Sequence, residues 1–370
     1  MTNKLGSGIL SKAISTLRDR VLKEVKRMEL NERMRRILAA VIHRYITTAE
    51  PVSSSIIAEK YNLNLSPATI RHEMNLLEKY DYLGQPHTSA GRIPTDRGYR
   101  FYVDNLMKKT HLKENEKEQI IQIYRKSKEF EETMKITSQL LSKLTNNIGV
   151  VLEPYIFNNL IKHIQFISVG NNRILVLMIT DTGLVYQKLI NLSGEITRSN
   201  LDYLSDFINI KLQEKDINLV NLYSILKEEL NKILSFQERF NYIHNFIEDC
   251  FNFRYFNDKV YLNGRINIMK QPEFRQTNNL NYILSFIEKE NILADTIRKY
   301  LTFENTQVII GREIQQKEIQ NCSLIARKYK IKGKPAGAIG ILGPTRMNYP
   351  RMISIVEFIS EKLGEVLSEF

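Results

Sequence analysis

The sequence predicts an α+β protein of more than one domain, and three observations lead to this prediction. The chain has 370 residues, of which 43% are hydrophobic, so it can bury a sizeable core and is too long for one ordinary domain. Three short helical patterns and a turn-rich segment fill residues 32–95. Strand patterns at 163–190 and 307–342 are separated by helical periodicity at 212–300. We therefore expect a helical N-terminal domain and an α+β body that contains an inserted helical domain.

The sequence predicts three N-terminal helices and a short connection between the second and the third. Apolar residues recur at helical spacing in residues 32–47 and again in residues 53–61. The third helix begins at Ser66, whose hydroxyl can cap it, and at Pro67, which suits the first helical position. Residues 62–65 connect the second helix to the third, and this length is typical of a helix-turn-helix.

The third helix separates an apolar stripe from a polar face. Ile70, Met74 and Leu77 fall on one side at helical spacing. The opposite face holds no carboxylate, since Glu73 and Glu78 are expected to point sideways, and its donors can read guanine and adenine edges in a major groove. An ordinary solvated helix face is the alternative. The candidate DNA-reading residues are Ser66, Ala68, Thr69, Arg71, His72, Asn75 and Lys79.

A turn-rich segment follows the third helix. Residues 84–95 contain two glycines, two prolines, one arginine and no acid, which is too irregular for a helix. Such a loop suits lying along phosphates or reaching into a minor groove, with Arg92 near its tip. We therefore predict a winged helix-turn-helix DNA-binding domain over residues 30–108. The candidate wing contacts are His87, Thr88, Ser89 and Arg92, and the candidate phosphate contacts on the first helix are Arg33, Arg35 and Arg36.

Several segments resemble a known family. The stretch SPATIRHEMNLLEKYDYLGQPHTSAGRIPTDRGYRFYVD at 66–104 is similar to the signature of the bacterial heat-inducible transcription repressor family HrcA. The resemblance extends from about Leu30 to the end of the chain, although Arg71-His72-Glu73 stands where the family has a more acidic or amidic run. The C-terminal part of the resemblance lies in GREI at 311–314, CSLIARKY at 322–329 and GAIGILGPTRMNYPR at 337–351.

The resemblance implies a function and partners. A member of this family would be a cytoplasmic homodimer that negatively regulates transcription of class I heat-shock genes, the chaperonin and Hsp70-type chaperone operons. It would bind the inverted-repeat operator CIRCE on double-stranded DNA, since two-fold protein symmetry matches operator symmetry. A GroE-type chaperonin would keep it active, and heat stress would derepress the operons. No cofactor is implied.

The resemblance also implies the organisation of the remaining chain. A GAF-like domain would occupy residues 109–211 and 301–370, with a charged connector helix at 112–146. A dimerisation domain would be inserted at 212–300. Two alternatives remain: a ligand-sensing winged-helix regulator whose GAF-like domain binds a small metabolite, and an enzyme that uses the winged helix for protein interaction.

Residues 1–29 form a basic amphipathic extension. Apolar residues recur at spacings near three and four between Ile9 and Val25, and residues 1–28 hold seven basic residues against two acidic ones. A continuous apolar core is missing, so a signal peptide is excluded. The extension is an arm that holds DNA or packs on a partner subunit, or else a helix that docks on its own domain or stays frayed.

The body shows strand and turn patterns of its own. Asp181-Thr182-Gly183 is a turn between two runs rich in Ile, Val and Leu, which predicts antiparallel pairing. The run GKPAGAIG at 333–340 lacks the spacing of a phosphate-binding loop and predicts a hairpin turn. Arg346 lies in a tight turn before the last helix, where we expect local hydrogen bonds to fix it. The predicted strands are 163–169, 173–180, 184–190, 307–310 and 336–342.

Several other classes of protein are excluded by what the sequence lacks. The six histidines form no HExxH or HxH pattern and no GxSxG motif is present, so the chain is not expected to be an enzyme. Cys250 and Cys322 form no CxxC motif, and we expect buried thiols in a reducing cytosol. The apolar run at 174–179 is far shorter than the roughly 20 residues that span a bilayer, so no membrane association is expected. The net charge of +12 is concentrated in residues 1–28, and residues 29–108 carry only eleven basic against nine acidic residues.

Overall fold

The protein is a mixed α/β chain that divides into two compact units, residues 1–108 and residues 109–370. The predicted N-terminal extension, Thr88 and Ser89 lie outside the described residues. The computed structural model describes residues 30–87, 90–154, 159–191, 197–233, 250, 259–275, 277–302 and 304–369.

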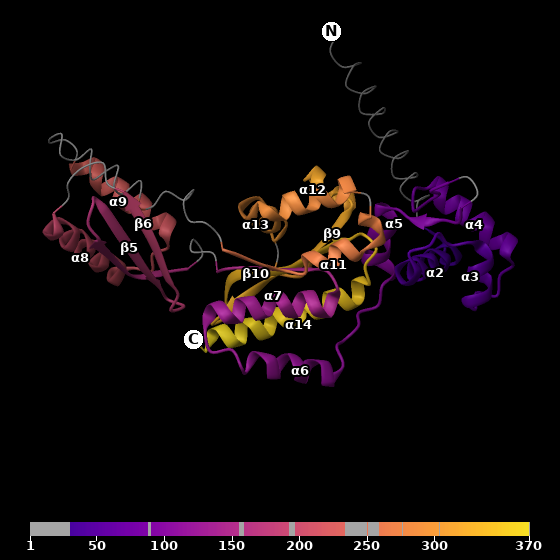
Figure 1. The fold of residues 1–370 in the computed structure, drawn as a ribbon, viewed down its shortest axis with the longest axis horizontal. Coiled ribbons are helices and arrows are strands. Elements are labelled where there is room, and N and C mark those ends of the chain that lie inside the picture. The colour runs from indigo at the N-terminus through magenta and orange to yellow at the C-terminus, as the bar shows by residue number, and fades with distance from the viewer. Residues whose placement is uncertain are drawn as a thin grey trace, which may run out of the picture. The chain divides into compact units, whose positions relative to one another are not determined.

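In the described residues of the first unit, helices α2 to α4 are followed by a short two-stranded ribbon and then by α5 and η1 (Figure 1). Helices α2 to α4 are capped by Asn31, Ser53 and Ser66, whose side chains each accept a hydrogen bond from a backbone N–H in the first turn. The third helix packs on the first and second. The elements are α2 (Glu32–Thr48), α3 (Ser54–Lys60), α4 (Pro67–Lys79), β1 (Leu83–Gly84), β2 (Ile93–Pro94), α5 (Asp96–Phe101) and the π-helix η1 (Tyr102–Leu106).

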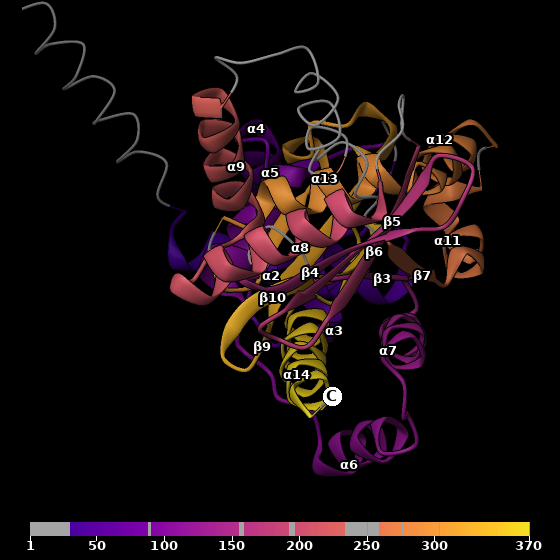
Figure 2. The same cartoon turned by 90° about the vertical axis from the view of Figure 1, so that its left-hand side faces the viewer.

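The second unit is built on a five-stranded antiparallel sheet in the order β7-β3-β10-β9-β8. Helices α7 and α14 lie on one face of this sheet and helices α11 to α13 on the other (Figures 1 and 2). The strands are β3 (Ile148–Leu152), β7 (Val260–Asn263), β8 (Gln307–Ile310), β9 (Cys322–Ile331) and β10 (Lys334–Pro344). The helices are α6 (Glu114–Tyr124), α7 (Phe130–Thr145), α11 (Arg265–Lys270), α12 (Thr277–Glu288), α13 (Glu290–Tyr300) and α14 (Tyr349–Ser368), with 3-10 turns η4 (Pro272–Phe274), η5 (Gly311–Glu313) and η6 (Lys317–Ile319).

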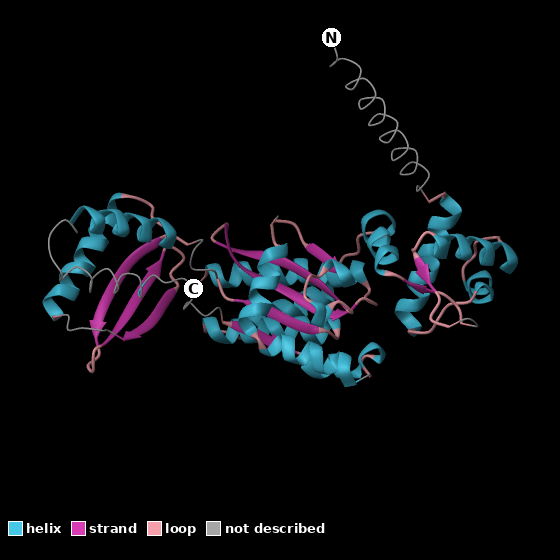
Figure 3. Ribbon diagram, turned by 90° about the horizontal axis from the view of Figure 1, so that it is seen from above, coloured by secondary structure: helices cyan, strands magenta, loops and turns pink. Residues whose placement is uncertain are grey.

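A second sheet with its own core lies between β3 and β7 in the chain. Strands β4 (Ile161–Ser168), β5 (Arg173–Thr180) and β6 (Val185–Asn191) pair antiparallel in that order. Helices α8 (Arg198–Glu214) and α9 (Leu219–Ile233) lie beside this sheet (Figure 3), and their buried apolar residues belong to the same core. This core is separate from the core that the five-stranded sheet forms with its helices.

This arrangement differs from the predicted bounds of the insertion, 212–300. The strands predicted at 163–190 form, but they pair only with one another and not with the body. Residues 260–300 pack on the five-stranded sheet instead of belonging to an insertion at 212–300. The described residues of the insertion therefore lie within 159–191, 197–233 and 250, and they contain both strands and helices. Periodicity failed here because it identifies a strand or helix without identifying the sheet on which it packs.

The predicted connector helix at 112–146 is in fact two helices, α6 and α7. Met134 and Leu141 of α7 are fully buried, and α7 packs on β3 and α14. The segment therefore belongs to the body, and its charged residues lie on the outer surface of that body.

The remaining expectations about the body concern a hairpin turn, the two cysteines and Arg346. The predicted hairpin turn between β9 and β10 is confirmed, with Lys332 and Gly333 at positive φ. Both cysteines are buried free thiols. Arg346 is held by Glu273 and Gln271, which are distant in sequence, whereas we expected local hydrogen bonds. Among the described residues, no helix is long and apolar enough to cross a membrane.

Candidate nucleic-acid interface

Helix α4 begins at Ser66 as predicted. The Ser66 Oγ atom accepts a hydrogen bond from the Thr69 backbone N–H at 3.1 Å and lies 2.9 Å from Thr69 Oγ1. Pro67 occupies the start of the helix, where a missing N–H leaves no hydrogen bond unmade. These contacts fix the first turn of α4, and the Ser66 hydroxyl that was predicted to meet DNA also caps the helix.

The two sides of α4 have opposite character, as predicted. Ile70 and Leu77 are fully inaccessible to solvent and Met74 nearly so. Thr69 is half-buried. The exposed residues on the other side are Ser66, Ala68, Arg71, His72, Asn75 and Lys79. The buried stripe fixes the orientation of α4, so these polar side chains project into solvent from a rigid element.

Glu73 departs from its predicted sideways position. Its side chain is buried, and its Oε1 atom lies 3.4 Å from Nη1 of Arg33 on α2. The pairing explains why a carboxylate tolerates burial beside an apolar stripe. Glu73 therefore adds no carboxylate to the exposed polar face of α4.

The three arginines predicted to contact phosphates differ in their surroundings. Arg33 pairs with Glu73, although half of its side chain stays exposed. The Nε atom of Arg35 donates to the Leu30 carbonyl at 2.8 Å, which ties this side chain to the start of α2. Arg36 is exposed. Arg36 is thus the arginine of this group best placed to meet a phosphate.

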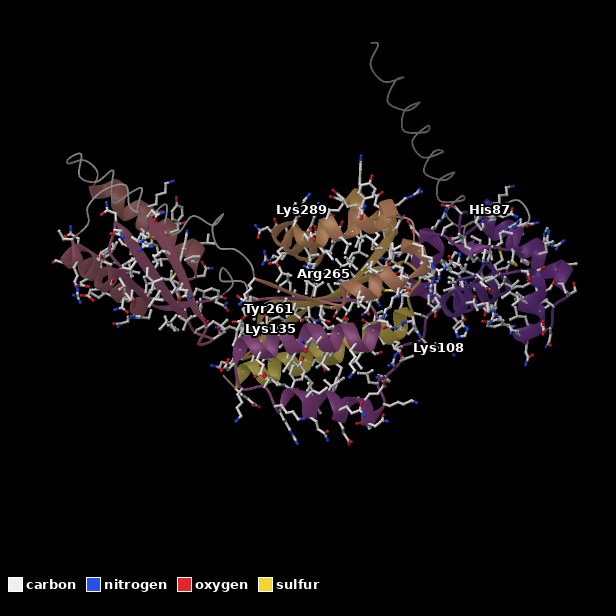
Figure 4. All side chains as sticks on the ribbon, in the orientation of Figure 1. His87, Lys108, Lys135, Tyr261, Arg265 and Lys289 are labelled. Carbon is white, nitrogen blue, oxygen red and sulfur yellow. The ribbon has the colours of Figure 1, made fainter. Side chains whose placement is uncertain are left out.

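The ribbon that follows α4 is anchored to the segment before α3. The backbone N–H of Val52 donates to the Arg92 carbonyl at 2.9 Å, and the Arg92 N–H donates to the Val52 carbonyl at 2.8 Å. A Cβ atom at Gly91 would lie only 2.5 Å from Val52 backbone atoms, so this close approach requires glycine. His87 is exposed in the loop between the two strands (Figure 4). Because its backbone is paired with Val52, Arg92 lies at the base of the β1–β2 ribbon.

The prediction that Arg92 lies near the tip of the wing was therefore wrong. Its guanidinium turns back onto α4, where Nη2 donates to Asn75 Oδ1 at 3.0 Å and lies 2.8 Å from Glu78 Oε2. Only 16% of the Arg92 side chain is exposed. The role of Glu78 was missed because no local pattern links it to a residue 14 positions away in the chain.

The part of the chain that the structure describes contains no group of three or more His, Cys, Asp or Glu side chains placed to hold a metal ion. The polar groups gathered around α4 are instead the Arg92–Glu78 ion pair and exposed hydrogen-bond donors, which are the kind of group that contacts bases and phosphates.

Comparisons with known proteins agree with the family resemblance that the sequence motifs indicate. Residues 131–353 match the family model described as the HrcA protein C terminal domain. The chain is 38% identical over 341 residues to the heat-inducible transcription repressor HrcA of Pelotomaculum thermopropionicum, covering 92% of this chain and 97% of the relative. This chain belongs to the HrcA family.

Other relatives and a solved structure extend this finding. The HrcA repressor of Desulforudis audaxviator is 39% identical over 344 residues, covering 92% of this chain and 99% of that protein. A crystal structure of a hypothetical protein matches 92% of this chain and 98% of its own, with a TM-score of 0.55 and 24% identity. Its similarity shows that this HrcA chain shares a fold with a solved protein.

Proposed function

We propose that this protein represses transcription of heat-shock genes by binding operator DNA through a winged helix-turn-helix at residues 30–108. The observation that carries the proposal is the exposed face of α4, where Arg71, His72, Asn75 and Lys79 project without a carboxylate among them. Arg and Asn side chains suit guanine and adenine edges in a major groove. The family names of the relatives, heat-inducible transcription repressors, support the same role and favour a regulator over an enzyme.

In this proposal, α4 is the recognition helix and the β1–β2 ribbon is the wing. Arg71, His72 and Asn75 would read bases, with Ser66, Ala68, Thr69 and Lys79 beside them. His87, Thr88 and Ser89 would reach the neighbouring groove or backbone, and Arg36 would contact phosphates. The operator is CIRCE, upstream of the chaperonin and Hsp70-type chaperone operons, and a GroE-type chaperonin keeps the repressor active.

A footprint tests these assignments together. The purified protein is mixed with its own chaperone promoter, with and without chaperonin. We expect protection of both halves of the inverted repeat, and stronger protection when chaperonin is present. Protection spread evenly over unrelated DNA would contradict sequence-specific repression, and an unchanged footprint would contradict the role of the chaperonin.

We further propose that the inserted domain carries the homodimer contact through one face of its sheet. Ile174, Val176 and Met178 are buried in the core of this domain, while alternate residues of β5 face the other way. On that other face, Ile179 pairs with Val185 and Leu175 with Leu189. Val185 is 62% exposed, Leu189 52% and Ile179 37%, and exposed apolar groups of this size mark interaction sites.

The proposed dimer contact can be tested with two variants, each of which adds a negative charge to a different side of the inserted domain. Leu189→Asp places a carboxylate on the proposed contact face, whereas Tyr203→Asp alters α8, where Tyr203 is 74% exposed. We expect Leu189→Asp to sediment as a monomer and to lose operator affinity, because two linked heads bind more tightly than one. Tyr203→Asp should stay dimeric. A dimeric Leu189→Asp protein would refute this interface.

The five-stranded sheet covered by helices on both faces supports a GAF-like body. A ligand-sensing role for that body is a weaker candidate. A cavity of about 210 Å³ is lined by Leu152, Arg298, Lys328 and neighbouring residues, and small-molecule sites usually have volumes of ~300 Å³ or more. Native mass spectrometry of the purified protein tests this role, since a copurified metabolite would favour it.

A further inference from the structure

Three polar side chains, Asn75, Glu78 and Arg92, form a cluster at one edge of the reading face of α4. Asn75 and Glu78 are three residues apart on the helix and therefore lie on neighbouring turns of one side. Arg92 reaches both of them, at 3.0 Å from Asn75 Oδ1 and 2.8 Å from Glu78 Oε2. The Arg92 backbone is paired with Val52, so the guanidinium is held from two directions.

The chemistry of arginine fixes which way the Asn75 amide points. A guanidinium has donors and no acceptor, so only the amide oxygen of Asn75 can face it. The amide NH₂ group, with its two hydrogens, is then directed away from Arg92. Asn75 is itself exposed, so this donor is available to an incoming base.

The same contacts reduce the suitability of Arg92 as a phosphate contact. Its charge is balanced by Glu78 at ion-pair distance, and its side chain is 16% exposed. To reach a phosphate, Arg92 would have to leave both Glu78 and Asn75. A partly buried charge gains little from exchanging one anionic partner for another.

We propose that Arg92 is a positioning residue, which orients the Asn75 amide so that its NH₂ group donates to a base, while Glu78 keeps Arg92 away from the phosphates. This inference rests on the proposed function. The base opposite Asn75 must then present an acceptor in the major groove, as guanine, adenine and thymine do. Cytosine presents only its amino donor there and would be rejected at that position.

Three measurements on the full-length dimer distinguish a positioning role of Arg92 from a role as a phosphate contact. They are the affinity for the operator, the affinity for random DNA, and the dependence of affinity on salt. We expect Arg92→Ala to weaken operator binding roughly tenfold, in the range of one lost base contact, with random DNA and the salt slope unchanged. The Arg92→Ala, Asn75→Ala double variant should be no weaker than either single variant. Equal losses on both DNAs, a slope reduced by about one, or additive losses would overturn the proposal.

If Arg92→Ala unfolds the wing, two further variants still test the proposal. Arg92→Lys retains the charge on a side chain one bond shorter, which does not extend to the position where Nη2 of Arg92 meets both Asn75 and Glu78, so we expect lost operator preference and an unchanged salt slope. Glu78→Gln releases the Arg92 charge, so affinity for random DNA and the salt slope should both rise. Normal operator preference in Arg92→Lys, or unchanged random binding in Glu78→Gln, would refute the proposal.

A matched control distinguishes this inference from the proposed function itself. Arg71 is exposed on α4 and lies outside the cluster. If Arg71→Ala loses operator binding while Arg92→Ala keeps it, only the positioning role fails. If neither change affects operator binding, α4 does not read DNA, and the proposed function fails as well.

Discussion

Removal of the α4 cap should loosen the first turn of this helix by a measurable amount. Ser66→Ala deletes the oxygen that accepts from the Thr69 N–H at 3.1 Å, and loss of such a cap costs about 1 kcal/mol. The Thr69 and Ile70 amides depend on this turn, since Ile70 donates to the Ser66 carbonyl at 3.0 Å. A cost of about 1 kcal/mol corresponds to roughly fivefold faster exchange of these amides.

Hydrogen exchange of the full-length protein measures this effect directly. Ser66→Asp is the matched control, because a carboxylate caps a helix as well as a hydroxyl does. We expect fast exchange at Thr69 and Ile70 in Ser66→Ala and near-normal exchange in Ser66→Asp. Unchanged exchange in Ser66→Ala would refute the capping role, and equally fast exchange in both variants would show that the oxygen acceptor is not what holds the turn.

Three further predictions address the core, the thiols and an ion pair. Leu77→Ala should destabilise the first unit by about 2–5 kcal/mol, because Leu77 is fully buried; calorimetry would contradict this if the unfolding temperature did not fall. Burial raises the pKa of the Cys322 thiol, and Cys250 is also buried, so neither should react with a thiol reagent near pH 8 until the protein is denatured. A hydrogen bond from Arg351 holds the pKa of Glu116 below its ordinary 4.5, so the pair stabilises the fold above that pH and the contribution is lost as pH falls through the lowered pKa. Arg351→Ala should return the Glu116 titration, followed by NMR, towards 4.5, and an unchanged titration would contradict the pairing.

Local features of the candidate site were predictable because local chemistry determines them. Ser66 and Pro67 mark the start of α4, and the spacing of Ile70 and Leu77 identifies its buried side. The turn at Gly183 was predicted for the same reason, since a positive φ of 85° favours glycine. In each case the deciding residues are neighbours in the chain.

Features that depend on distant residues were not predictable. Glu73 is buried because Arg33, 40 residues away, meets it. Arg92 turns inward because Asn75, 17 residues away, accepts from it. The predicted ranges of the strands between β3 and β7 agree closely with the observed ones. Alternation of apolar residues along a strand, however, does not specify its partner strand. The predicted bounds of the insertion differ from the observed sheets and cores for that reason.

The central claim is that the exposed face of α4 reads bases, and Arg71→Ala tests it most directly. Binding is measured on the operator of the protein's own chaperone promoter and on random DNA at the same salt concentration. We predict a loss of about 1–3 kcal/mol on the operator and much less on random DNA, whereas Arg36→Ala should weaken both alike. Equal losses on both DNAs from Arg71→Ala would contradict base reading by α4.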